Sequence, residues 1–72
     1  MRQAKHIEVV DRLENEGWRF DHTALVNRYR YAGTITPMQT RKGMEYCRVH
    51  HGECVGRRSY QVTTVMSKRK EN

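Results

Sequence analysis

The 72-residue chain lacks long apolar runs, and no stretch approaches the roughly 18 consecutive apolar residues of a membrane-spanning helix. Its N-terminal segment, residues 1–17, is basic at the tip but has no continuous apolar stretch of the kind found in signal peptides. From these two absences we expect neither a helical membrane protein nor a secreted precursor. We therefore expect a soluble, cytoplasmic protein.

Cysteine is also scarce, and in a reducing cytoplasm we expect both residues, Cys47 and Cys54, to be free thiols. His50 and His51 lie between them, and thiolate and imidazole groups are the usual ligands of zinc. The spacing C-x2-H-H-x2-C does not match two close ligand pairs separated by a longer loop. We predict no cofactor and no metal. A zinc site on Cys47, His50 and Cys54 and a Cys47–Cys54 disulfide remain as alternatives.

Catalytic patterns are absent as well. The sequence has no paired carboxylates that stand out, no glycine-rich phosphate loop and no Walker motif. A cysteine near a histidine supplies only part of a nucleophilic site, which also needs an orienting group. We predict that the protein is not an enzyme.

What the chain does contain is enough for one small domain over residues 1–72, with an apolar fraction of 36% and a charged fraction of 31%. A core of this size seldom contributes more than about 3–5 kcal/mol, so a homodimer or another partner could add stability. We expect an ordered region over residues 4–66. Residues 67–72 contain no apolar side chain and should form a frayed basic tail.

Residues 4–16 are predicted to form a helix, because apolar residues recur there at intervals of three, with Gly17 as its C-terminal cap. Residues 59–66 alternate as a strand does, and residues 44–49 form a second extended run. A tight turn at His51-Gly52 is expected to bring Cys47 and Cys54 to one face. Pro37 should stop strand pairing, followed by a basic loop over residues 38–43.

The segment 21–32 fits either a strand or a helix. The alternation of aromatic and basic residues in NRYRY and the β-favouring TIT after it favour a strand. A helix would start at Asp21, end before Gly33 and give a helix–turn–helix-like pair over residues 4–32. With the strand interpretation, the fold class is α+β: one N-terminal helix packed on an antiparallel sheet of about three strands.

Positive charge is concentrated after the first helix. Residues 1–16 carry three basic and four acidic side chains, whereas residues 17–72 carry eleven basic and four acidic ones, a balance of +7. Such asymmetry favours an anionic partner, above all nucleic acid, with tyrosines available to stack on bases. The side chains predicted to contact phosphate are Arg28, Arg30, Arg41, Lys42, Arg57 and Arg58.

The sequence therefore predicts a small basic nucleic-acid-binding or regulatory protein. Its basic sheet and loop surface is expected to bind the phosphate backbone. The alternative is a protein-binding module or inhibitor, of the type that mobile elements encode, which docks on a larger protein. Its basis is the thin core and the prospect of exposed strand edges that could accept another strand.

Overall fold

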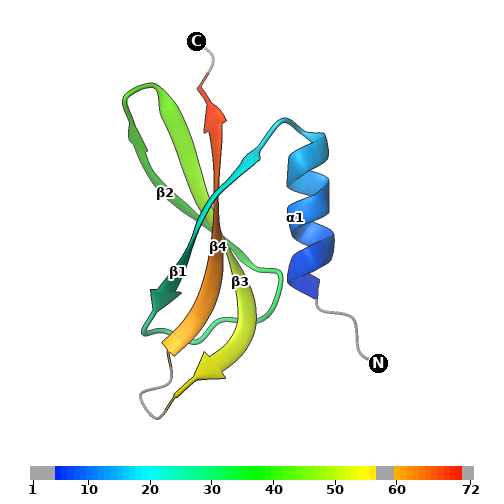
Figure 1. Ribbon diagram of the computed structural model, residues 1–72, viewed down its shortest axis with the longest axis vertical. Helices are drawn as coiled ribbons and strands as arrows, with labels where there is room; N and C mark the ends of the chain where they lie inside the picture. The colour runs from blue at the N-terminus through cyan, green and yellow to red at the C-terminus, as the bar shows by residue number, and fades with distance from the viewer. Residues whose placement is uncertain (1–4, 57–59, 71–72) are drawn as a thin grey trace.

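The computed structural model describes residues 5–56 and 60–70, and it shows one helix packed on one antiparallel sheet (Figure 1). The strand order is β1-β4-β3-β2, so β4 and β3 are central and β1 and β2 form the edges. The α+β class is confirmed, with four strands in place of about three. The elements are α1 (Lys5–Asn15), β1 (Arg19–Val26), β2 (Ile35–Arg41), β3 (Met44–Val55) and β4 (Tyr60–Arg69).

Helix α1 ends in the cap that the sequence predicted. Gly17 has a φ of 102°, and its N–H donates to the carbonyl of Glu14 at 3.1 Å. The N–H of Trp18 donates to the carbonyl of Leu13 at 3.0 Å, which completes a Schellman motif. This cap turns the chain back, so Trp18 packs half-buried against the core.

The apolar core lies between α1 and the central strands. Val9 and Leu13 of the helix pack on Cys47, Val49 and Met66 of the sheet. Val49 and Met66 have no exposed surface. We call this side of the sheet the covered face, and it contains most of the buried apolar area.

The opposite side of the sheet, which we call the open face, is not covered by a helix from the described residues (Figure 1). Strand alternation and pairing register place Arg48 and His50 of β3 there, with Gln61, Thr63 and Val65 of β4. The three β4 residues nevertheless have no exposed surface. The sheet is strongly twisted, so that the flanking strands enclose the middle of β4.

The predicted turn at His51-Gly52 is wrong, because β3 continues through it to Val55. Gly52 instead belongs to a bulge, where the register against β4 shifts between His50 and Cys54. Its φ is 80°, and a Cβ there would lie 2.7 Å from Ala32, so glycine is required by both conformation and space. The next reversal of the chain lies beyond Val55, and residues 57–59 are outside the described part.

For the segment 21–32, the strand prediction is correct only as far as Val26, and the helix alternative is wrong. Val26 pairs with Gln61 near the start of β4, so the backbone beyond it has no strand to pair with. The side chain of Gln61 takes the place of a partner strand. Its Oε1 accepts from the N–H of Arg30 at 2.9 Å, and its Nε2 donates to the carbonyl of Arg30 at 2.5 Å.

Strand β2 runs through Pro37, so the predicted end of pairing there is also wrong. An edge strand needs hydrogen bonds on one side only, which makes a proline tolerable. The expected loop over residues 38–43 shrinks to a turn at Lys42-Gly43. Strand β4 extends to Arg69, and residues 71–72 of the predicted tail lie outside the described part. In the described ranges, no helix is both long and apolar enough to cross a bilayer.

Candidate nucleic-acid interface

Two hollows on the open face hold the cations that the sequence singled out. Arg28 and Arg30, from the loop between β1 and β2, line one hollow of about 410 Å³, the loop hollow. Arg41 and Lys42, at the turn between β2 and β3, line a second of about 430 Å³, the turn hollow. The other two predicted residues, at positions 57 and 58, lie outside the described residues.

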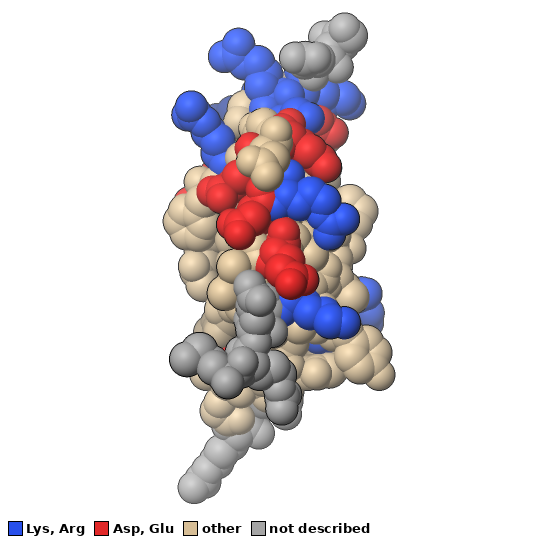
Figure 2. Space-filling view, turned by 90° about the vertical axis from the view of Figure 1, so that its right-hand side faces the viewer, with Lys and Arg blue, Asp and Glu red and all other residues tan. Residues whose placement is uncertain are grey.

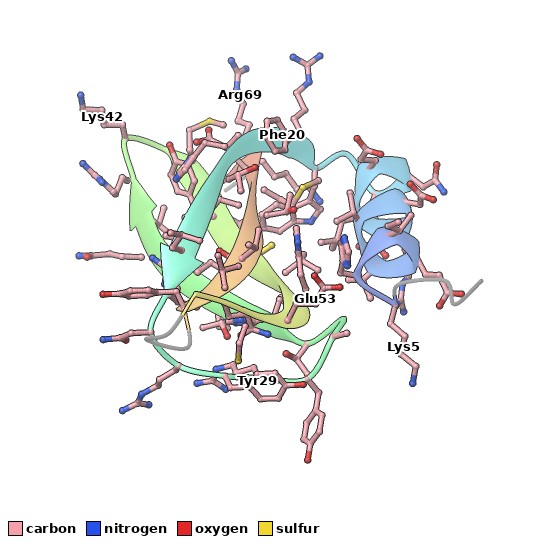
Figure 3. The ribbon with its side chains drawn as sticks, turned by 60° about the horizontal axis from the view of Figure 1, so that its bottom comes forward. Lys5, Phe20, Tyr29, Lys42, Glu53 and Arg69 are labelled. Atoms are coloured by element: carbon pink, nitrogen blue, oxygen red, sulfur yellow. The ribbon has the colours of Figure 1, made fainter. Side chains whose placement is uncertain are left out.

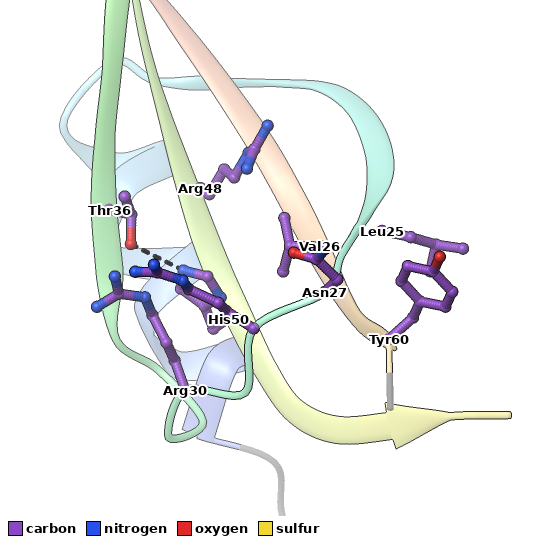
Figure 4. A pocket seen from close by; sticks show the side chains of 9 residues that line it. Leu25, Val26, Asn27, Arg30, Thr36, Arg48, His50 and Tyr60 are labelled. Carbon is purple, nitrogen blue, oxygen red and sulfur yellow. Dashed lines mark hydrogen bonds between the residues drawn. The ribbon is translucent and has the colours of Figure 1, made fainter. Parts of the chain in front are cut away.

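The loop hollow also contains Arg48, which the sequence did not mark as a site residue. In Figure 4, Arg30 lies beside His50 on one side and Tyr60 lies beside Leu25 at the far rim, with Val26 and Asn27 between them and Arg48 above. Within the described residues, the Nε of Arg48 is buried and has no hydrogen-bond partner. A buried N–H left unpaired costs about 1–3 kcal/mol.

His50 forms a fixed, neutral part of the wall of the loop hollow. The Oε1 of Gln61 already accepts from the backbone of Arg30, so the His50 Nδ1–H must be the donor in their 3.1 Å contact. The His50 Nε2 then accepts from the hydroxyl of Thr36 at 2.8 Å. Burial lowers the pKa of His50, and the charges of Arg30 and Arg48 lower it further, against the opposing effect of the Gln61 hydrogen bond.

This network positions the arginines. It ties the loop after β1 to β4, β3 and β2 through Gln61, His50 and Thr36 in sequence. Arg28 and Arg30 belong to that loop and are themselves exposed. The backbone of Arg30 is therefore held, while both side chains are exposed and can meet an anion.

The turn hollow has a similar composition. Arg41 and Lys42 line it together with Tyr46, and Lys42 lies on the side of the molecule away from α1 (Figure 3). Asp21 is the acid that lines it, and its Oδ2 accepts from the Nδ1 of His22 at 2.5 Å. The turn hollow is therefore of mixed charge, with two cations and one carboxylate.

Acidic side chains gather on the other side of the molecule. Figure 2 shows them over α1, where four exposed acids follow the helix and its cap: Glu8, Asp11, Glu14 and Glu16. In residues 5–56 and 60–70, the one ion pair found joins Asp21 and His22. None of the described cations of the open face forms an ion pair with a described carboxylate, although Asp21 lines the turn hollow beside Arg41 and Lys42.

The candidate metal ligands are not brought together. Cys47 is buried beneath α1, Cys54 is exposed, and His50 faces the open side, with both thiols free. Burial raises the pKa of the Cys47 thiol and Glu45 adds to the effect, so this group stays protonated and is a poor nucleophile. Across the described residues, no group of three or more histidine, cysteine or acidic side chains could hold a metal ion.

His51 lies on the covered face, opposite to His50. Its ring stacks on that of His6 from α1, with centroids 3.7 Å apart and an interplanar angle of 13°. A 2.7 Å hydrogen bond joins its Nε2 to the hydroxyl of Thr64. Burial lowers the pKa of His51, and His6 lowers it further, although Glu53 acts in the opposite direction. This pair belongs to the packing of the helix, not to the basic surface.

Sequence reasoning omitted Arg48 from the predicted phosphate contacts, whereas Tyr46 and Tyr60 were among the tyrosines expected to stack on bases. The signal was present, because strand alternation in residues 44–49 puts Tyr46 and Arg48 on one face. Comparison with protein families, with curated proteins and with solved structures finds no match to this chain. The site is therefore interpreted from its own chemistry.

Proposed function

We propose that this protein binds nucleic acid through the open face of its sheet and acts as a small binding or regulatory protein without catalysis. The observation that carries the proposal is the common location of five cations. Arg28, Arg30 and Arg48 line the loop hollow, and Arg41 and Lys42 line the turn hollow.

The electrostatics support a polyanion as the ligand. Cations at two separate points along one face can contact phosphates that succeed one another on a chain. The acids on α1 lie on the other side of the sheet, where basic side chains lie among them and leave a surface of mixed charge (Figure 2), so the open face is the better candidate to meet a polyanion. Arginine also recognises phosphate with two parallel N–H donors, which makes three arginines in one hollow a favourable anion site.

Binding to fluorescently labelled DNA and RNA oligonucleotides, measured by anisotropy over a salt series, tests the proposal. Counterion release predicts a log–log slope of about −0.7 for each phosphate contacted on a single strand and about −0.9 on a duplex. Five contacts would thus give a slope between about −3.5 and −4.5.

A matched pair of double variants separates this surface from net charge. R41Q/K42Q removes two positive charges from the open face, while K5Q/R12Q removes two from α1. The first is expected to lower the slope by roughly one to two units, and the second to change it little. Equal effects of the two variants, or affinity that does not change with salt, would refute the proposal.

A second candidate function rests on the edge strand β1. Phe20 and Leu25 on this edge are each 57% exposed, and an edge with apolar side chains can accept a strand from another protein. Docking on a larger protein, or forming a homodimer, would use this edge. A partner retained after nuclease treatment and lost in F20K, which lies outside both hollows, would support this function, and recovery of nucleic acid alone would oppose it.

The cellular setting is part of the same proposal. A buried free thiol such as Cys47 suits a reducing compartment, so we assign the protein to the cytoplasm, where nucleic acid is accessible.

A further inference from the structure

We propose that the nucleic acid bound at the open face is single-stranded, and that each hollow receives one unpaired base against a tyrosine. This inference rests on the proposed function and specifies its ligand. The tyrosines are Tyr60 in the loop hollow and Tyr46 in the turn hollow.

The composition of the two hollows carries the argument. Each combines cations with one tyrosine: Arg28, Arg30 and Arg48 with Tyr60, and Arg41 and Lys42 with Tyr46. Proteins that bind single strands use this combination, since cations follow the phosphates while flat aromatic rings stack on the bases. Both tyrosines are half-buried, which holds the rings in place and lowers the entropic cost of stacking.

The size of the hollows favours bases over phosphates alone. Volumes of about 410 and 430 Å³ fall in the range of sites for small organic molecules, roughly 300–1,000 Å³. A phosphate group alone would leave most of that space empty. In a duplex the bases are paired and stacked inside, so a duplex would contact only the rims of the two hollows. Placing a base in a hollow would require unstacking it, which costs a few kcal/mol per base.

The separation of the hollows sets a length for the ligand. Tyr60 begins β4, and Tyr46 pairs with Ser67 seven residues further along that strand. At about 3.3 Å per residue, the two sites are about 23 Å apart. A strand with the stacked rise of about 3.4 Å per nucleotide would span this distance with about seven nucleotides, and a more extended strand with fewer.

The experiment compares labelled 12-nucleotide oligo-dT and oligo-U with a 12-base-pair DNA duplex, all at one salt concentration. The variants Y46L and Y60L replace each flat ring with an apolar side chain, whereas Y46F and Y60F keep the ring. Y31L is the matched control, since Tyr31 is 77% exposed and lines neither hollow. Thermal melts check that each variant is folded.

We expect single strands to bind at least tenfold tighter than the duplex. Each leucine variant should weaken single-strand binding by about fivefold or more, with the salt slope unchanged, because stacking does not release counterions. Both phenylalanine variants and Y31L should bind like the unmodified protein, and single strands shorter than about four nucleotides should bind weakly because they reach only one hollow.

Two results overturn the inference and leave the proposed function intact: salt-dependent binding in which the duplex equals or exceeds the single strands, or leucine variants that bind like Y31L. Failure of every probe to bind in a salt-dependent manner refutes the proposed function itself. If one leucine variant does not fold, the other leucine variant together with the duplex comparison decides the question.

Discussion

The two faces of the sheet bury side chains of different kinds, although both draw on the same strands. On the covered face, Val49 and Met66 pack against the apolar side of α1. On the open face, Gln61 and Thr63 are equally buried, and Gln61 is satisfied by the backbone of Arg30. Apolar packing thus holds the helix, and a hydrogen-bond network holds the loop that carries two of the arginines.

The adjacent residues His50 and His51 show the same division between the open and the covered face. His51 stacks on His6 beneath the helix, while His50 bonds to Gln61 and Thr36 on the other side. The comparison suggests that stability depends chiefly on the covered face and recognition on the open one. Three substitutions or conditions test this division.

The largest effect should come from Met66→Ala. A cavity at this fully buried position costs about 2–5 kcal/mol, comparable to the about 3–5 kcal/mol that a core of this size supplies. Val65 is equally buried but lines the turn hollow, so Val65→Ala opens space towards solvent and should cost about 1–2 kcal/mol. Urea unfolding at 25 °C measures both losses, and equal values would show that the faces contribute alike.

An intermediate effect is expected for Gln61→Leu. Leucine has a similar size but leaves the backbone of Arg30 and the Nδ1 of His50 without their partner, a loss of about 2 kcal/mol. Exposed Gln39→Leu, the control, should stay within about 0.5 kcal/mol. Amide hydrogen exchange should show faster exchange in residues 27–34, and oligonucleotide affinity should fall with it. Unchanged affinity in a folded Gln61→Leu variant would mean that the loop needs no anchor.

The smallest effect is a dependence of stability on pH. The folded protein lowers the pKa of His50 and of His51 below the ordinary value of about 6.5, so the unfolded chain takes up protons more readily. The stabilisation is fully present above about pH 6.5 and is lost as the pH falls through the lower folded values. Urea unfolding at pH 7.5 and 5.5 measures the loss.

Single variants divide that pH dependence between the faces. H51F keeps an aromatic ring against His6 but cannot titrate, and H50N removes the titrating group of the open face. Each variant should remove the part of the pH dependence of stability that comes from the histidine it replaces. If the unmodified protein were as stable at pH 5.5 as at pH 7.5, neither histidine would be held neutral by the fold.

Local periodicity made some elements predictable. The three-residue spacing of the first helix and the alternation in Tyr60 to Met66 depend on one element at a time, and both predictions are confirmed. Gly17 was predictable for the same reason, since a helix cap is decided by the residues beside it.

Features that depend on distant partners were not predictable. His51-Gly52 has the composition of a turn, but Ala32 from another segment packs there and the glycine serves a bulge. The alternation in NRYRY suggests a strand, but no partner strand extends past Gln61. The basic residues were identifiable from the charge balance of the sequence. That they line two hollows, and that Arg48 lines one of them, could not be predicted because it depends on the pairing of β3 with β4.

The position of β4 at the centre of the sheet has a consequence for biosynthesis. Strand β1 pairs only with β4. Val26 therefore cannot form its strand pairing until Gln61, thirty-five residues later in the chain, has been made. While the ribosome makes the intervening residues, the β2–β3 hairpin can form and α1 can contact Cys47 and Val49 of β3, but the core still lacks Met66 of β4. Folding is therefore expected to occur in one late step, when the last strand emerges and joins both halves, and a nascent chain stalled before residue 60 should be readily degraded.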